Sequence, residues 1–275
     1  MSKQNEDKLY YGRVSEKKYW RNLEEYLLFL RHKKTYFFVS QYCNDKVVMD
    51  FGCGLGYGSF LLSGVSKKVI GVDIEQAIIS QCIKKYKSKN LIFQLIKSNK
   101  KTPYIDSFFD IVVSSQVIEH IKDVTSYLIE LKRILKANGK LFIITPNRNY
   151  RLLPFQKPWN PDHMREYSLE ELHKELNIIF DNVDIFGIRG TEEINKIEIK
   201  RVRQTPFKAY VLHPLKRLIG IDFYIFLRNK VHFQKENKHK LFVKVELLKK
   251  YSLKNFFINK ENLDTCLDYF AICKK

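Results

Sequence analysis

Residues 46 to 59, KVVMDFGCGLGYGS, constrain this chain more than any other stretch. Three apolar residues lead to Asp50, and Gly52, Gly54 and Gly56 then alternate with other residues before a second apolar segment. The pattern predicts a short buried strand, a glycine-rich turn and the start of a helix. Glycine permits positive φ and close approach of a ligand, and a helix N-terminus presents free amide groups. The stretch therefore predicts a binding site for a nucleotide-like ligand.

Two kinds of nucleotide site compete for this stretch. A dinucleotide site has the pattern G-x-G-x-x-G/A, but the third position is Tyr57 when counted from Gly52 and Ser59 when counted from Gly54. A carboxylate at Asp50 repels a pyrophosphate and suits a ligand that carries an ammonium group. S-adenosylmethionine has such a group and no phosphate. VVMDFGCGLGYGS closely resembles the first motif of class I S-adenosylmethionine-dependent methyltransferases.

The resemblance, which covers roughly residues 30 to 190 and the last strand, implies a fold and a cofactor. The fold is a doubly wound, Rossmann-like α/β sheet of seven strands, in which the final strand, LDYFAICKK, is an antiparallel edge. The cofactor is S-adenosyl-L-methionine, with S-adenosyl-L-homocysteine as product. We expect an N-terminal helical cap over 1–45, a cofactor-binding domain over 46–188 plus 263–275, and a basic insertion over 189–262.

The five cysteines and the N-terminus bear on the compartment. The cysteines are odd in number and scattered, with no C-x-x-C pair, so neither a disulfide framework nor a zinc site is expected. The first residues carry charges and no apolar core of a signal peptide, and the longest apolar run is too short to span a bilayer. We therefore expect a cytoplasmic enzyme.

The positive charge is concentrated in one segment. The net charge is +19, and residues 201–250 hold thirteen Lys or Arg against three Asp or Glu. This segment mixes bases with Tyr, Phe, Leu and Ile, so it suits peripheral contact with an anionic membrane surface, an anionic acceptor, or a homodimer interface. No RNA-binding module is recognisable, and we expect no nucleic-acid partner.

The second and third predicted strands carry further cofactor-binding candidates. Asp73 ends the strand KKVIGVD, 21 residues after Gly52, the distance at which an acid meets ribose hydroxyls in nucleotide-binding α/β units. We predict that Asp73 binds the ribose and that Ile74 lies under the adenine. After the third strand the family pattern has an acid and a small residue, and here Ser98 and Asn99 take those places, so we predict a hydrogen bond to the adenine from one of them.

A polar group follows the predicted fourth strand. Gln116, Glu119 and His120 are spaced i, i+3 and i+4, which predicts one helix face looking into the cleft. The run resembles the E-x-x-E-H of ubiquinone-type O-methyltransferases, where the acids and the histidine hold a divalent metal. Because Gln116 replaces the first acid, we predict no metal site. Gln116 is a candidate for cofactor binding, and Glu119 and His120 are candidates for catalysis.

The loop after the fifth strand contains NPDHMREYS, residues 160 to 168. It resembles the N-P-x-H-x-R-E-[FY]-S signature of methyltransferases from bacterial surface-polysaccharide gene sets. Ser168 begins the next helix, with Glu171 at the capping-box position. His163 lies beyond a strand's carboxyl end among polar neighbours and is our first candidate for a general base.

The acceptor is the part of the function that the motifs constrain least. The leading hypothesis is O-methylation of a sugar, a nucleotide-linked or a phosphate-bearing intermediate of surface-glycan (capsule or lipopolysaccharide) biosynthesis. A quinone or lipid-like phenol is the alternative acceptor. A module that binds the cofactor without methylating anything is the alternative from another class of protein.

Overall fold

One mixed sheet of eight strands, in the order β3-β2-β1-β4-β5-β8-β6-β7, organises the chain. The computed structural model describes residues 22–97, 101–152, 156–158, 160, 162–206 and 245–275. The strands are β1 (Val47–Phe51), β2 (Lys68–Asp73), β3 (Leu91–Leu95), β4 (Phe109–Ser115), β5 (Leu135–Pro146), β6 (Asn182–Gly190), β7 (Phe256–Asn259) and β8 (Asp268–Lys274).

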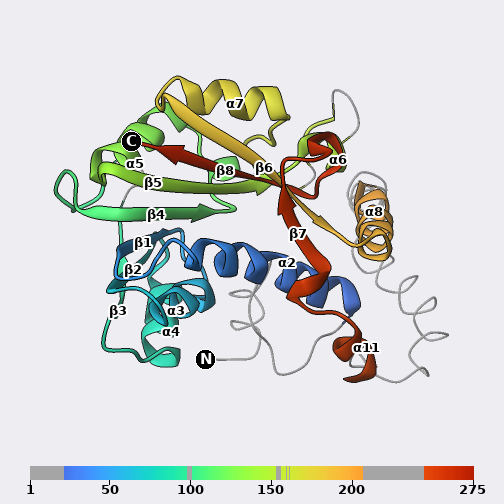
Figure 1. Cartoon of the computed structure of the whole chain (residues 1–275), viewed down its shortest axis with the longest axis horizontal. Coiled ribbons are helices and arrows are strands. Elements are labelled where there is room, and N and C mark those ends of the chain that lie inside the picture. Colours follow the sequence, from blue (N-terminus) through green and yellow to red (C-terminus); the bar gives the residue numbers. More distant parts are fainter. Residues whose placement is uncertain (1–21, 98–100, 153–155, 159, 161, 207–244) are drawn as a thin grey trace, which may run out of the picture.

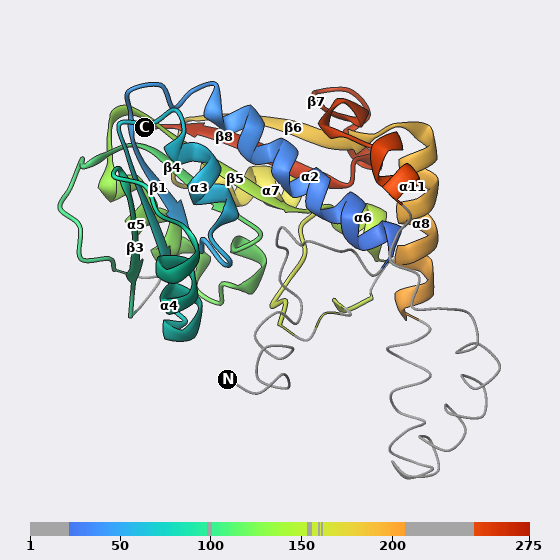
Figure 2. The same ribbon diagram turned by 90° about the horizontal axis from the view of Figure 1, so that it is seen from below.

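The helices lie on both faces of this sheet (Figures 1 and 2). The α-helices are α2 (Leu23–Ser40), α3 (Tyr57–Ser63), α4 (Gln76–Lys85), α5 (Val124–Ile134), α6 (Arg148–Arg151), α7 (Leu169–Asn177), α8 (Glu192–Pro206) and α11 (Val245–Lys250). Single 3-10 turns are η1 (Ile118–His120), η3 (Leu253–Asn255) and η4 (Leu263–Thr265). None of these described helices is both long enough and apolar enough to cross a membrane.

Strands β1 to β5 are parallel, as the resemblance predicts. The final strand, β8, is antiparallel to β5 and to β6, which confirms its predicted direction. Its predicted place at the edge is wrong, because β8 lies between β5 and β6. The burial of β8 explains this: six of its seven residues, 268–273, are buried, as expected of an interior strand with both faces covered.

The sheet has one strand more than the seven predicted. The additional strand, β7, pairs antiparallel with β6, from Gly187↔Asn259 to Gly190↔Phe256. It comes from the predicted basic insertion over 189–262, whose described residues also form α8 and α11. A four-residue strand gives too short an alternation to stand out in the sequence, and it forms because β6 continues to Gly190 and offers an unpaired edge.

Two apolar layers hold the helices to the sheet. On one face, Tyr36 and Val39 of α2 and Leu62 of α3 pack against the strands. On the other face, α5 and α7 pack through residues such as Leu131 and Leu172. A third cluster joins the first half of α2 to α8 and β7, and it includes Leu27, Ile194 and Phe256. Helix α2 therefore connects the sheet core to the elements that follow β6.

Local capping sets where several helices begin. The Asn22 side chain accepts a hydrogen bond from the Glu25 amide at 2.8 Å and starts α2. Within the helical cap expected over 1–45, the structure has one helix from Leu23 to Ser40, and residues 1–21 lie outside the described part. The predicted capping box is confirmed at α7, where Ser168 and Glu171 exchange hydrogen bonds.

Candidate active site

The carboxyl ends of β1, β2, β4 and β5 meet at one edge of the sheet, because these strands are parallel. The predicted site residues follow these strand ends.

The glycine loop after β1 has the backbone conformation that its sequence predicts. Gly52, Gly54 and Gly56 all have positive φ, at 73°, 50° and 78°. A Cβ added at Gly52 would lie 2.5 Å from a methyl carbon of Val117, so no larger residue fits there. The Gly52 amide also donates to the Val72 carbonyl oxygen at 2.8 Å, which fixes the loop against β2. The conformation and the packing of the loop therefore require glycine at position 52.

Asp50 is fully buried at the end of β1 and holds two helices. Its carboxylate accepts a hydrogen bond from the Tyr36 hydroxyl at 3.0 Å and one from the Ser59 hydroxyl at 2.6 Å. These contacts tie α2 and α3 to the glycine loop, a role that the sequence did not indicate. Contact of Asp50 with an ammonium group stays a prediction. Burial raises the pKa of Asp50 to about 6, although the hydrogen bonds from Ser59 and Tyr36 act in the opposite direction.

This raised pKa predicts a pH-dependent effect of Asp50→Asn on stability. An unfolded Asp has a pKa of about 4, so between pH 4 and 6 the folded chain keeps a proton that the unfolded chain releases. The stability that this proton contributes is present below pH 4 and is lost as the pH rises through 6. In urea unfolding, the stability of Asp50→Asn relative to wild type should therefore rise on the order of 3 kcal/mol between pH 4 and pH 8.

Asp110 provides a control of opposite sign. Burial raises the pKa of Asp110, but hydrogen bonds from the Val47 amide and Lys136 outweigh it, and the net pKa is lowered. For Asp110→Asn, the stability relative to wild type should therefore fall, not rise, as the pH increases from acid to neutral. Equal pH slopes for the two variants would contradict the assignment to Asp50.

Asp73, at the end of β2, binds loop backbone. Its carboxylate oxygens accept hydrogen bonds from the Gly54 amide at 3.0 Å and the Glu75 amide at 3.1 Å, and the residue is 6% exposed. Ile74 beside it is 64% exposed, so an apolar surface is available next to the acid. The ribose and adenine contacts stay predictions. Ser98 and Asn99, the other candidates for the adenine, lie outside the described residues.

The residues after β4 do not form the predicted helix face. Gln116 has positive φ, at 58°, and only Ile118–His120 form a 3-10 turn, so Gln116, Glu119 and His120 do not share one α-helical face. Positive φ at a non-glycine residue interrupts a right-handed helix. The Gln116 amide donates to the Ile144 carbonyl oxygen at 2.8 Å. Its side-chain nitrogen is buried and has no hydrogen-bond partner among the described residues.

The three residues predicted to be catalytic lie together. Glu119, His120 and His163 each place one nitrogen or oxygen ligand atom within 4.8 Å of the others. The rings of the two histidines are perpendicular, with centroids 4.7 Å apart. The loop after β5 reaches the turn after β4 through backbone: the Met164 amide donates to the Glu119 carbonyl oxygen at 2.8 Å. Residues 43 positions apart in the chain thus form one cluster of imidazoles and a carboxylate.

The Glu119 side chain is fully buried in this cluster. One carboxylate oxygen, Oε2, accepts a hydrogen bond from the Thr145 hydroxyl at 3.0 Å. The other, Oε1, has no hydrogen-bond partner among the described residues. Burial raises the pKa of Glu119 to about 8, because a charged carboxylate is poorly solvated there.

Both histidines are oriented through Nδ1. His120 Nδ1 lies 2.8 Å from the Asp162 carbonyl oxygen, and His163 Nδ1 lies 2.8 Å from Glu166 Oε1. Glu166 is buried, and its second oxygen lies 3.3 Å from Arg151 Nε, with which it forms an ion pair. The sequence alone indicates no role for Glu166, although it is the glutamate of the N-P-x-H-x-R-E signature three residues after His163.

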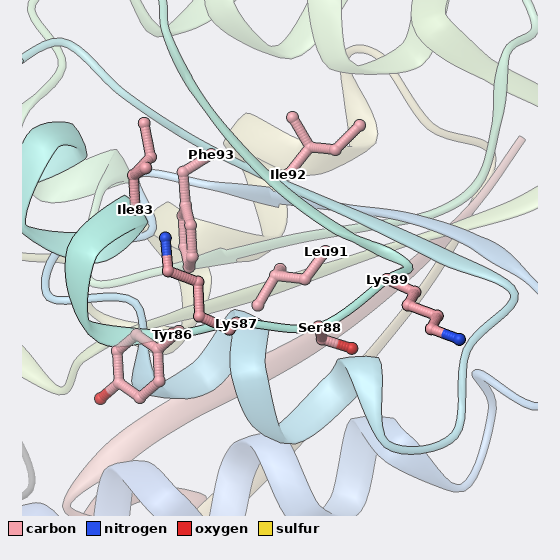
Figure 3. A pocket seen from close by; sticks show the side chains of 8 residues that line it. All are labelled: Ile83, Tyr86, Lys87, Ser88, Lys89, Leu91, Ile92 and Phe93. Atoms are coloured by element: carbon pink, nitrogen blue, oxygen red, sulfur yellow. The ribbon is translucent and has the colours of Figure 1, made fainter.

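An open depression elsewhere on the sheet does not belong to this site (Figure 3). It is formed by the end of α4, the turn after it and the start of β3, and its lining includes Tyr86, Lys89 and Leu91. Leu91 is the first residue of β3, so this depression includes the amino end of a parallel strand, whereas the predicted site residues follow strand carboxyl ends.

Comparison with known proteins identifies the family. A family model described as a methyltransferase domain matches residues 49–143. A probable S-adenosylmethionine-dependent methyltransferase of Mycolicibacterium smegmatis is 30% identical over 186 residues, which cover 66% of this chain and 68% of that protein. Two further matches, to probable S-adenosylmethionine-dependent methyltransferases of Mycobacterium tuberculosis, span only about half, 52%, of those proteins.

A more distant relative is also a methyltransferase, and a solved structure supports the fold. A ubiquinone biosynthesis O-methyltransferase of Thiobacillus denitrificans is 31% identical over 38% of this chain and 46% of its own. The crystal structure of a putative methyltransferase from Bacillus halodurans superposes with a TM-score of 0.51 at 14% identity, covering 88% of this chain and 97% of that one, which supports the fold. The chain belongs to the class I S-adenosylmethionine-dependent methyltransferases.

Proposed function

We propose that this chain transfers the methyl group of S-adenosylmethionine to an oxygen of a small-molecule acceptor. The observation that carries the proposal is the cluster of Glu119, His120 and His163 beside the strand carboxyl ends. The sulfonium of the donor is already activated, so the protein mainly positions the two partners and excludes water. An oxygen acceptor must also lose a proton, and a positioned base contributes ~10²–10⁴-fold to that step.

His163 is the proposed general base. Its Nδ1 faces the carboxylate of Glu166, so the proton of a neutral ring resides on Nδ1 and the lone pair on Nε2. Arg151 holds the second oxygen of Glu166, which restricts the carboxylate and with it the ring. His120, whose Nδ1 donates to a carbonyl oxygen, is the second candidate, with Glu119 adjacent to it.

The proposed acceptor is a sugar, a nucleotide-linked or a phosphate-bearing intermediate of surface-glycan assembly. Support comes from the loop over residues 160–168, which resembles methyltransferases of that setting, and from the net charge of +19, which favours an anionic small molecule. In this proposal the glycine loop and Asp50 bind the methionine end of the cofactor, and Asp73 and Ile74 bind its nucleoside end.

A quinone or lipid-like phenol is the second candidate acceptor. The observation that favours it is the 31% identity to a protein named ubiquinone biosynthesis O-methyltransferase. A phenol is more acidic than a sugar hydroxyl, so it depends less on a base. The two candidates therefore differ in how much turnover each loses when His163 is replaced.

The test is transfer of a labelled methyl group to defined acceptors. The whole chain is incubated with methyl-labelled S-adenosylmethionine and either nucleotide-activated sugars or a polyprenylated dihydroxybenzene, and the products are read by mass spectrometry. A methyl ether on a sugar supports the leading acceptor, and one on the phenol supports the second and overturns the first. Cofactor binding without transfer to either acceptor or to any fraction of a bacterial extract overturns the enzymatic proposal in favour of a binding module.

A further inference from the structure

We propose that Glu119, His120 and His163 bind a divalent transition-metal ion, with His163 as a ligand supplied by the distal loop. The resemblance in the turn after β4 concerns only the E-x-x-E-H stretch, and Gln116 leaves that stretch one acid short. The structure places a different third ligand, His163, next to Glu119 and His120. The contiguous motif alone predicts no metal site, because it does not include a ligand 43 residues away.

The cluster has a ligand set and a size that suit such an ion. The three ligand atoms lie within 4.8 Å of one another. Ligands of a bound zinc lie about 2.0–2.2 Å from the metal, and therefore roughly 3–3.5 Å from one another. The limit of 4.8 Å exceeds this spacing by roughly 1–2 Å, and rotation of the exposed His120 side chain can close the difference.

The unsatisfied oxygen of Glu119 is an independent indication of a ligand. The side chain is 0% exposed, and Oε1 has no hydrogen-bond partner among the described residues. Leaving a buried acceptor without a partner costs about 1–3 kcal/mol, so such atoms are rare unless they bind something. Thr145 holds the other oxygen at 3.0 Å and fixes the direction of the carboxylate. A cation at the cluster would satisfy Oε1 directly.

The partners of the histidines match those of metal ligands. A metal-binding histidine usually donates its other ring N–H to a carboxylate or a backbone carbonyl, which fixes the tautomer and the ring. His163 meets the carboxylate of Glu166 and His120 meets the Asp162 carbonyl oxygen, both at 2.8 Å through Nδ1. In both rings this arrangement leaves Nε2 as the nitrogen that carries the lone pair.

The donor set selects the class of metal. Two imidazoles and one carboxylate suit zinc, iron(II), cobalt(II), nickel(II) or manganese(II), whereas magnesium and calcium prefer oxygen ligands throughout. The third ligand is a histidine rather than an acid, so we expect this chain to prefer a transition metal to magnesium. This preference separates it from a site built from two acids and one histidine.

The inference rests on the ligand cluster, and only its catalytic consequence rests on the proposed function. When bound, a divalent ion lowers the pKa of an oxygen that it contacts, which would ease deprotonation of the acceptor. The Nε2 lone pair of His163 serves either as a metal ligand or as a proton acceptor, so an ion replaces the base role of His163. Metal binding and methyl transfer are therefore measured separately.

The experiment is a metal titration of the full chain after dialysis against a chelator. Zinc binding is followed by calorimetry, and cobalt(II) is followed by its visible absorption, which reports nitrogen and oxygen ligands without any turnover. We expect one equivalent of zinc to bind, His163→Ala and Glu119→Gln to weaken it at least ~100-fold, and Glu166→Gln to weaken it ~10–100-fold. His173→Ala, on the exposed face of α7, is the control and should bind as wild type does.

Three outcomes would overturn the inference. The first is that wild type binds zinc no more tightly than His163→Ala does. The second is that the chain binds magnesium more tightly than zinc. The third is that His173→Ala weakens zinc binding as much as His163→Ala does. Far-ultraviolet circular dichroism of each variant shows that it is folded, and His163→Gln, which keeps a donor to Glu166, replaces His163→Ala if the latter unfolds. If the chain binds zinc but transfers no methyl group, the proposed function is wrong and the metal site stands. If methyl transfer persists after chelation, only the catalytic role of the metal is wrong.

Discussion

Replacing Arg31 with Met should destabilise the folded chain by about 3–5 kcal/mol, because it removes the cation that pairs with buried Asp268 and one of the two arginines that pair with buried Glu198. Arg31, on α2, is 3% exposed. Its Nη1 lies 3.3 Å from Glu198 on α8, and its Nε lies 2.9 Å from Asp268 on β8. Methionine keeps the length of the apolar stem, so the loss reports the charge and not a cavity. The measurement is the free energy of unfolding in urea at neutral pH.

The same variant should recover when Asp268 is neutralised. Adding Asp268→Asn to Arg31→Met removes the carboxylate that has lost its ion pair and should restore part of the lost free energy, whereas Glu198 keeps its ion pair with Arg201. Lys196→Met is the control, since Lys196 pairs with Glu192 on the exposed side of α8 and its loss should leave the urea midpoint unchanged. A loss below about 1 kcal/mol for Arg31→Met would show that water or another cation solvates the two acids.

The Arg31→Met substitution should also affect the cofactor loop, because α2 connects the buried ion pairs of Arg31 with Asp50 at the end of β1. Arg31 and Tyr36 lie little more than one turn apart on this helix, and Tyr36 donates to Asp50 at the end of β1. A shift of α2 would therefore move the Tyr36 hydroxyl that donates a hydrogen bond to Asp50. Weaker cofactor binding by Arg31→Met in conditions where it remains folded would show this coupling.

The parts of the fold that the sequence predicted are those with local signals. The strand and glycine loop of residues 46 to 59 combine an apolar run with residues that only positive φ explains, and the structure has both. The capping box at Ser168 and Glu171 is a four-residue pattern, and it too is present. Such features depend on a few neighbouring residues, so one sequence is enough to predict them.

The features that the sequence did not predict depend on contacts distant in the chain. The position of β8 between two strands and the pairing of β7 with β6 are set by tertiary packing, which short alternating segments do not encode. The buried contacts of Asp50 with Tyr36 and Ser59 come from helices before and after its strand. Spacing alone suggested a helix face after β4, but the positive φ of Gln116 breaks it.

In the candidate site too, the sequence predicts the local motifs but not the contact between them. His163 and the Glu119-His120 pair were each found from local motifs, but neither motif says that the two loops touch. That contact depends on hydrogen bonds between the loop after β5 and the backbone of Glu119. Glu166 was visible in the sequence only as part of a signature. Its role needs the distance of 2.8 Å to His163 and the ion pair to Arg151.

Replacing His163 with Gln should lower kcat by ~10²–10⁴-fold and leave the affinity for S-adenosylmethionine unchanged. The amide of glutamine can still donate to Glu166, so the buried carboxylate keeps a partner and the fold is retained. The glutamine has no imidazole lone pair, so it neither accepts the acceptor's proton nor binds an ion as a histidine does. Calorimetry of the cofactor and single-turnover transfer of a labelled methyl group separate binding from chemistry.

A matched comparison decides whether this loss belongs to the cluster. His173→Gln makes the same chemical change on the exposed face of α7 and should keep full turnover. Glu166→Gln preserves the shape beside His163 but removes the charge that holds the ring, so its kcat should fall between those of wild type and His163→Gln. If His163→Gln kept full turnover with a sugar acceptor, His163 would be neither the base nor a ligand needed for catalysis. His120, whose ring centroid lies 4.7 Å away, would then be the group to replace next.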